Sequence, residues 1–287
     1  MVYLALSVVF SSLIFVIFKL FTRFKVDTLY AIVTNYVVAC SVGLLFYKGE
    51  VIVSQIQKKP WFWGTLALGF LFILVFNLMA ATAQRVGVSV ASVATKMSLV
   101  IPVLFGVLIY NEELGPLKIL GVALALGAVY FASVKGKSIT VEKSSLILPL
   151  LVFLGSGVID TSIKYIQEVY ISEEDYPIFS ATVFGSAATV GLIFILFKVI
   201  KSPVKMNLRN ILGGIVLGIP NYFSMYFLLK ALENDTLNSA SVFTINNVAI
   251  VMLSTLLGIL LFKEKISVKN WGGIALAVVS IILVALF

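Results

Sequence analysis

Apolar stretches, each roughly as long as the 20 residues that a helix needs to cross a bilayer, follow one another along the whole chain. Short polar gaps separate them. The runs are continuous rather than alternating, which excludes a membrane β-barrel. We therefore expect ten membrane-spanning helices, at residues 3–22, 28–47, 61–82, 88–109, 116–134, 145–168, 177–199, 208–231, 239–262 and 267–287.

The composition indicates the same class of protein. Hydrophobic residues make up 61% of the 287 residues and charged residues 12%, about half the charged fraction of a soluble domain. That is too little polar surface to cover a water-soluble globule, so the chain is expected to be a multi-pass protein of the cell (inner) membrane. The first stretch has neither a charged start nor a small-residue cleavage site, so it is expected to be a retained helix rather than a signal peptide.

The charge and the rare residue types exclude several classes of function. The net charge of +8 does not indicate nucleic-acid binding, because most basic residues lie in the gaps between apolar runs. The single cysteine, Cys40, excludes an intrachain disulfide and a cysteine-cluster metal site. Since the chain has no histidine and no GxxxxGK[ST] loop, we expect no metal site, no cofactor and no use of nucleotide energy.

The two halves of the chain resemble each other. Four short segments match in the same order, and two aspartates, Asp27 and Asp175, also correspond: FVIFKLF (15–21) with DTSIKYI (160–166), SVGLLF (41–46) with TVGLIF (189–194), LIYNEEL (108–114) with LLFKEKI (260–266), and GVALALGAV (121–129) with GIALAVVSI (273–281). The matches predict two five-helix repeats, residues 1–134 and 145–287. An odd number of spans makes the second repeat insert upside down, as in secondary transporters whose substrate site lies between inverted repeats.

With this duplication, the chain resembles the EamA-like branch of the drug/metabolite transporter superfamily over essentially its whole length. A small-residue helix, a glutamate turn and a Gly/Ala-rich helix occur in each half, and Pro102 matches a proline common in the family's fourth helix. The resemblance implies an all-α fold of two inverted five-helix repeats around a central cavity. It also implies that helices 1, 3, 4, 6, 8 and 9 line the cavity, while helices 5 and 10 are peripheral.

The distribution of basic residues predicts an orientation. Loops with odd numbers, counted from the N-terminus, hold 13 Lys and Arg residues, whereas the even loops hold five. The positive-inside rule then places the odd loops in the cytoplasm and both termini outside. The family resemblance implies the opposite, with both termini inside.

Two charged residues lie deep inside predicted spans, Lys96 and Asp160. Such residues are functional candidates, because an uncompensated charge there costs about 3 kcal/mol. Asp160 has two possible partners: Lys164, one turn away on its own helix, or Lys96 across the cavity. Lys19 and Lys164 are secondary candidates, since long side chains near span ends can also reach the membrane surface.

The other candidates are polar or aromatic side chains at mid-depth on the helices expected to line the cavity: Ser11, Asn77, Ser92, Ser156, Asn221, Tyr222, Asn246 and Asn247. Helical spacing puts Ser92 on the face of Lys96, and Ser156 on the face of Asp160. Small polar residues also mediate packing between membrane helices, which is the alternative for each of them. Pro102 and Pro220 each remove a backbone hydrogen bond and permit a kink. The turn glutamates Glu112, Glu113 and Glu264 are candidates for ion coupling, or simply favour the start of the next helix.

These features predict a secondary transporter of a small polar metabolite that works by alternating access. A lysine in the cavity favours a carboxylate-bearing substrate, such as an amino acid or organic acid. If Asp160 gains and loses a proton, it couples proton flow to transport; exchange is the other energy source, and export is the direction commoner among relatives. A passive channel and, remotely, a membrane-embedded enzyme using Asp160 and Lys96 are the alternatives. The expected partners are the substrate and the lipid bilayer, and a homodimer is left open.

Overall fold

The computed structural model describes residues 1–47, 53–110, 115–133, 143–171, 175–201, 207–232 and 239–286. Within these ranges the chain is helical and contains no strand. The helices are α1 (Val2–Phe24), α2 (Thr28–Phe46), α3 (Val53–Ile56), α4 (Phe62–Arg85), α5 (Val88–Met97), α6 (Val100–Tyr110), α7 (Pro116–Ser133), α8 (Lys143–Tyr170), α9 (Tyr176–Lys201), α10 (Leu208–Leu232), α11 (Ser239–Phe262) and α12 (Val268–Leu286).

The described helices confirm the expected membrane fold. Nine helical segments in the described part of the chain are long and apolar enough to cross a membrane, and the shorter apolar helix Val268–Val284 lies at the tenth expected position. The protein is thus a multi-pass membrane protein built from two inverted five-helix repeats. The short helix α3, between the second and third spans, was not expected from the sequence.

The fourth span is interrupted in its middle, between α5 and α6. Proline has no backbone N–H, so Pro102 cannot donate to the carbonyl oxygen of Ser98 four residues earlier. The N–H of Ile101 donates to that oxygen instead, at 2.9 Å, and the helix breaks at Ser98 and Leu99. Pro220, by contrast, lies inside the continuous helix α10.

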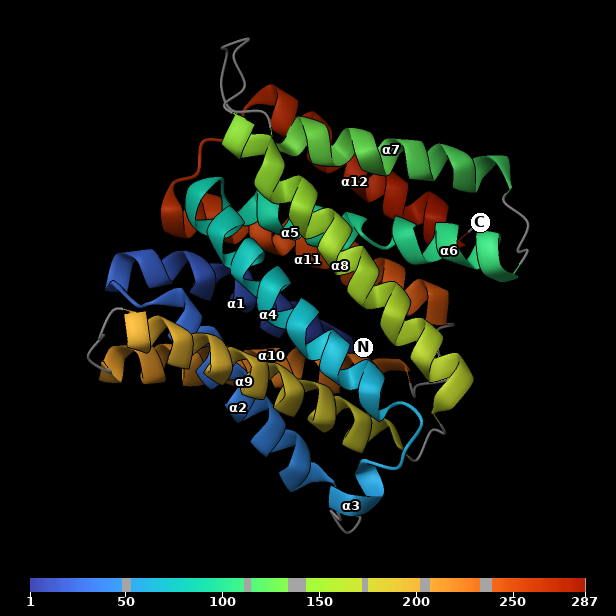
Figure 1. Cartoon of the computed structure of the whole chain (residues 1–287). Helices are drawn as coiled ribbons and strands as arrows, with labels where there is room; N and C mark the ends of the chain where they lie inside the picture. The colour runs from blue at the N-terminus through green and yellow to red at the C-terminus, as the bar shows by residue number, and fades with distance from the viewer. Residues whose placement is uncertain are drawn as a thin grey trace.

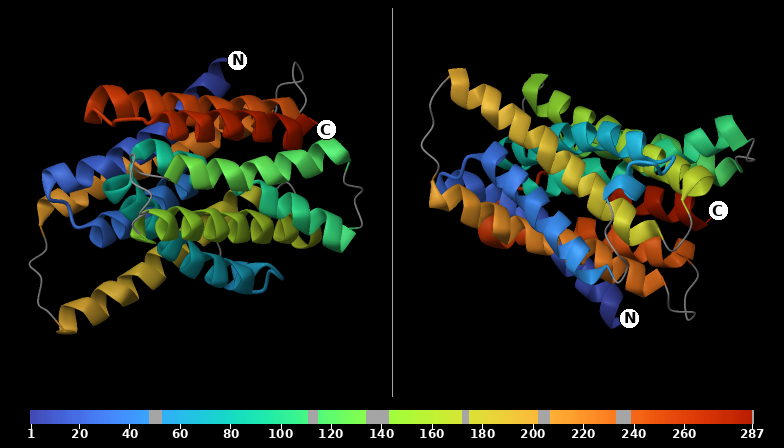
Figure 2. Two further views of the ribbon diagram at one scale, coloured as in Figure 1. Left: turned by 90° about the horizontal axis from the view of Figure 1, so that it is seen from above. Right: turned by 60° about the horizontal axis from the view of Figure 1, so that its bottom comes forward.

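The helices form a bundle whose two edges are built differently (Figure 1). Helices α7 and α12 pack side by side along one edge, where the hydroxyl of Ser280 donates to the carbonyl oxygen of Gly121 at 2.7 Å. Figure 2 shows this pair from two further directions. Helices α2, α9 and α10 pack together at the opposite edge. The helices between these edges, α1, α4, α5, α8 and α11, surround the centre of the bundle.

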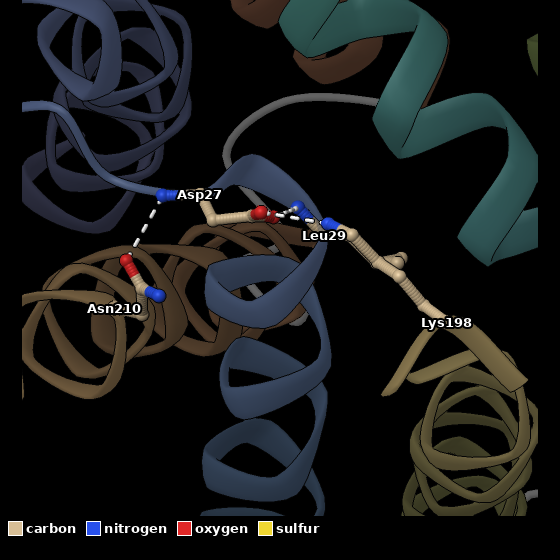
Figure 3. Close-up of polar contacts among 4 residues, drawn as sticks. All are labelled: Asp27, Leu29, Lys198 and Asn210. Carbon is tan, nitrogen blue, oxygen red and sulfur yellow. Dashed lines mark hydrogen bonds and ion pairs between the residues drawn. The ribbon is translucent and has the colours of Figure 1, made fainter. Parts of the chain in front are cut away.

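Two ion pairs join the repeats at opposite ends of α2 and α9. Asp27, the N-cap of α2, accepts a hydrogen bond from the N–H of Leu29 and pairs with Lys198 of α9 at 2.7 Å (Figure 3). Its counterpart Asp175, at the start of α9, pairs with Lys59 just before α4, also at 2.7 Å. The aspartates that match in sequence therefore each pair with a lysine of the other repeat, although Lys198 lies near the end of α9 and Lys59 just before α4.

Candidate functional site

A cavity of about 620 Å³ lies at mid-depth between the repeats. Its walls come mainly from α4, α5, α8 and α11, with smaller contributions from α6 and α10. No lining residue in the described chain comes from α1, α7 or α12. The polar lining residues are Thr95, Lys96, Ser98, Ser156, Asp160, Lys164, Asn246 and Asn247.

The two intramembrane charges face each other across this cavity. Lys96, on α5, is half-buried, and Asp160, on α8, is exposed to the cavity although helices surround it. Their charges interact, yet no N–O distance within the 4 Å of an ion pair joins these two described residues. The charge of Lys96 acts on the carboxylate of Asp160. The arrangement leaves space between an ammonium and a carboxylate.

The break in the fourth span supplies a further partner for Asp160. The hydroxyl of Ser98 lies 3.1 Å from Oδ2 of Asp160 and 2.6 Å from the carbonyl oxygen of Thr95. Ser98 was not among the residues singled out in the sequence. The signal for it was available, because Pro102 removes the hydrogen bond to the Ser98 carbonyl and so marks this position as the break.

Three more of the predicted residues reach the cavity. The hydroxyl of Ser156 is buried and has no hydrogen-bond partner among the described residues, and the residue lines the cavity. Asn246 accepts a hydrogen bond from Ser7 at 3.1 Å, which also ties α11 to α1. Asn247, the next residue on α11, lines the cavity and is half-buried.

The structure places the remaining candidates outside the cavity. The side chain of Asn77 donates to the carbonyl oxygen of Ile73 in its own helix, and that of Asn221 donates to Asn35 of α2 at 3.1 Å. Ser92 accepts a hydrogen bond from Ser254 at 2.6 Å, a buried contact between the repeats. Tyr222 stacks on Phe46 and Tyr226, and Ser11 is half-buried on α1. Asn221 and Ser92 thus make the packing contacts between helices that are the alternative role of such residues, whereas Asn77 bonds to the backbone of its own helix.

The odd-loop end of the bundle is tied together by polar contacts. The ammonium of Lys19 donates to the carbonyl oxygen of Gln84 at 2.8 Å. The amide of Gln84 donates to the carbonyl oxygen of Phe18 and to the hydroxyl of Thr28. These contacts fasten the end of α1 to the end of α4, on the side of the cavity away from the even loops.

A glutamate of the second repeat completes this end. Glu264 accepts a hydrogen bond from the N–H of Val88 at 2.8 Å and another from Ser89 at 3.3 Å. It therefore favours the start of α5 in the other repeat, not the start of the next helix as expected from the sequence. Gly87 permits this approach, since its φ is +152° and a Cβ there would lie 3.1 Å from Oε2 of Glu264. Glu112 and Glu113 lie outside the described residues.

Comparisons with known proteins agree with this architecture. The sequence profile of the EamA-like transporter family matches residues 1–134 and 143–286. An uncharacterized protein of Haemophilus influenzae is 30% identical over 281 residues, which cover 94% of this chain and 93% of that protein. A protein crystal structure of 15% sequence identity has a TM-score of 0.58 and matches 98% of this chain and 97% of its own, a likeness of fold.

Proposed function

Because the chain belongs to the EamA-like transporter family, and is thus a membrane transporter of the drug/metabolite superfamily, we propose that it carries a small carboxylate-bearing metabolite. The family is one of transporters and not of enzymes. Amino acids are the first choice of substrate, with other small organic acids next. Transport takes place by alternating access between the two inverted repeats.

The observation that supports this proposal is that two described residues, Lys96 and Asp160, both line the cavity without forming an ion pair with each other. An isolated charge at this depth is costly, so an ammonium and a carboxylate held apart favour a ligand that bears both opposite charges. An amino acid places its carboxylate at Lys96 and its ammonium at Asp160. The unpartnered hydroxyl of Ser156 and the amide of Asn247 supply neutral hydrogen bonds beside them. A cavity of about 620 Å³ has the size usual for small-molecule sites.

Coupling follows from the same carboxylate. When the substrate leaves, Asp160 keeps a hydrogen bond from Ser98 and faces Lys96 without contact. A proton on Asp160 neutralises the carboxylate in place of the substrate ammonium during the return of the empty carrier. Proton coupling through Asp160 is therefore one driving force, and exchange of one substrate for another is the second. Export is the proposed direction.

We propose that the protein lies in the inner membrane. Its orientation follows from the count of Lys and Arg residues in the loops, which puts the odd loops in the cytoplasm. The cavity then lies toward the outer face and the tied end toward the cytoplasm. A cytoplasm-only reporter fused after Phe287 checks this assignment. Reporter activity there would reverse it, without changing the proposal about the substrate.

Counterflow in proteoliposomes tests the function. Proteoliposomes that contain the purified protein and are filled with an unlabelled mixture of amino acids should take up labelled amino acid from outside, and this uptake should saturate. Lys96→Gln and Asp160→Asn should each lower the rate at least about a hundredfold, since each leaves one substrate charge unpaired at low dielectric. Lys118→Gln, on the peripheral helix α7, serves as the matched loss of one lysine and should keep the rate. Full rates in either cavity variant would refute the proposed site, and flux that does not saturate would indicate a channel.

A further inference from the structure

A second groove lies between the C-terminal end of α1 and the N-terminal end of α10. It has a volume of about 640 Å³ and is separate from the central cavity. Apolar side chains wall it, among them Leu20, Leu212 and Val216. Leu212 is 51% and Val216 55% exposed, so this wall faces the hydrocarbon of the bilayer.

Three cationic side chains stand at the odd-loop end of the groove. Arg23 lies in the last turn of α1, Lys25 is its left-handed C-cap, and Arg209 lies in the first turn of α10. All three are exposed. Within the described chain, their side chains make no hydrogen bond and no ion pair. Their charges are therefore not neutralised by the protein around them.

The acidic residue nearest to them in the chain, Asp27, already has partners for both of its carboxylate oxygens. Asp27 follows Lys25 by two residues, but its Oδ1 accepts from the N–H of Leu29 and its Oδ2 pairs with Lys198. Figure 3 shows this side chain directed toward Leu29 and Lys198, while its backbone N–H donates to Asn210. The cation that neutralises Asp27 thus comes from α9 and not from the groove.

The position of Arg209 adds to the excess of positive charge. The N-terminus of a helix carries a partial positive charge, so a cation there is unfavourable and an anion is favoured. Arg209 sits at this end of α10 next to Arg23 and Lys25 in the groove wall. From Arg209 to Val216 the helix rises about 10 Å, so apolar wall continues from the cations into the hydrocarbon layer.

We propose that this groove binds an anionic phospholipid of the leaflet that faces the odd loops. Arg23, Lys25 and Arg209 hold its phosphate. The first part of an acyl chain lies along Leu20, Leu212 and Val216. The lipid joins the end of α1 to the start of α10, two helices of different repeats.

Thermal unfolding of delipidated protein in detergent, with added phosphatidylglycerol or phosphatidylcholine, tests the site. Phosphatidylglycerol should raise the melting temperature of the unaltered protein more than phosphatidylcholine does, because a ligand of the folded state stabilises it. The variant R23Q/K25Q/R209Q should lose this difference, with affinity for phosphatidylglycerol reduced roughly tenfold or more. The control K263Q/K265Q/K269Q removes three exposed cations from another odd loop and its following helix, and should keep the difference.

A second variant separates the acyl-chain wall from the charges. Val216→Trp fills the groove and keeps all three cations, and should weaken phosphatidylglycerol binding as counted by native mass spectrometry. Ile215→Trp adds the same bulk one residue away, outside the groove lining, and should not. The proposal would be overturned if R23Q/K25Q/R209Q and Val216→Trp both kept the preference for phosphatidylglycerol. It would also be overturned if the control K263Q/K265Q/K269Q lost this preference to the same extent as R23Q/K25Q/R209Q. An equal thermal shift with inorganic phosphate would show an anion site without a lipid and would also overturn it.

Discussion

Helix α1 and its counterpart in the second repeat, α8, have the same place in their repeats but different neighbours. Helix α1 packs most extensively along α10 and α11 of the other repeat, and it also contacts α4 and α5 of its own repeat. Helix α8 makes no comparable packing with α10 or α11 in the described chain. The cavity lies beside α8, and α1 contributes nothing to its described lining. Two repeats of similar sequence are thus held in two different packings, and the cavity lies on the side where the first helix of its repeat does not pack on its own repeat.

Two lysines that match between the repeats, Lys19 and Lys164, differ in the same way as the helices that carry them. Lys19 of α1 donates to Gln84 in the tied end, whereas its counterpart Lys164 of α8 lines the cavity. The matched aspartates Asp27 and Asp175, in contrast, each pair with a lysine of the other repeat. These ion pairs join the two ends of α9 to α2 and to the residues before α4, whereas the contacts that differ between the repeats lie around the cavity. Under the proposed alternating access, we therefore expect α1 and α8 to be the elements whose packing exchanges.

The largest effect is expected at the glycine that lets Glu264 reach α5. Gly87→Ala should destabilise the protein by about 2 kcal/mol or more, because alanine is strained at a φ of +152° and its Cβ crowds the carboxylate. The measurement is thermal or denaturant unfolding in detergent. Gly272→Ala is the control, since a Cβ there meets nothing within 4 Å and alanine suits a helix. Equal loss in both variants would show that the tied end does not depend on this contact.

An intermediate effect is expected from the matched lysines. Lys164→Gln should raise the KM for transport about fivefold with little change in stability, because this side chain borders the proposed substrate site. Lys19→Gln should lower stability by about 1 kcal/mol through the lost hydrogen bond to Gln84, with a smaller change in KM. Transport kinetics and unfolding are measured on the same preparations. If the two variants behave alike, the asymmetry between α1 and α8 has no functional meaning.

The smallest effect is expected from the ion pairs of the two matched aspartates. Asp27→Asn keeps the helix cap and removes the charge, and Lys198→Gln removes its partner. A double-mutant cycle should give a coupling of about 0.5 kcal/mol, since both side chains are more than 30% exposed. The cycle of Asp175→Asn with Lys59→Gln should give a similar value. Couplings that differ by more than about 1 kcal/mol would contradict the similar strength expected of the two contacts.

Much of the fold was predictable because it depends on length and composition. A run of about 20 apolar residues has few alternatives to a spanning helix, so the spans appear where expected. Part of the cavity was predictable as well, because a charge inside a span must face protein or water rather than lipid. Lys96 and Asp160 obey this rule. Asn77 and Asn221 do not lie in the cavity, because amides can instead bond to a helix backbone or to each other.

The sequence by itself determined the class of protein, the number of spans, the duplication and the two charges at mid-depth. Only the tertiary structure decided which copy of each repeated feature faces the cavity, and where Glu264 binds. The physical reason lies in the membrane, since side chains that face lipid and side chains that face the core are both apolar. Helical periodicity therefore carries little information about which face is inside. Contacts between residues far apart in the chain, such as Glu264 with Val88, settle that question.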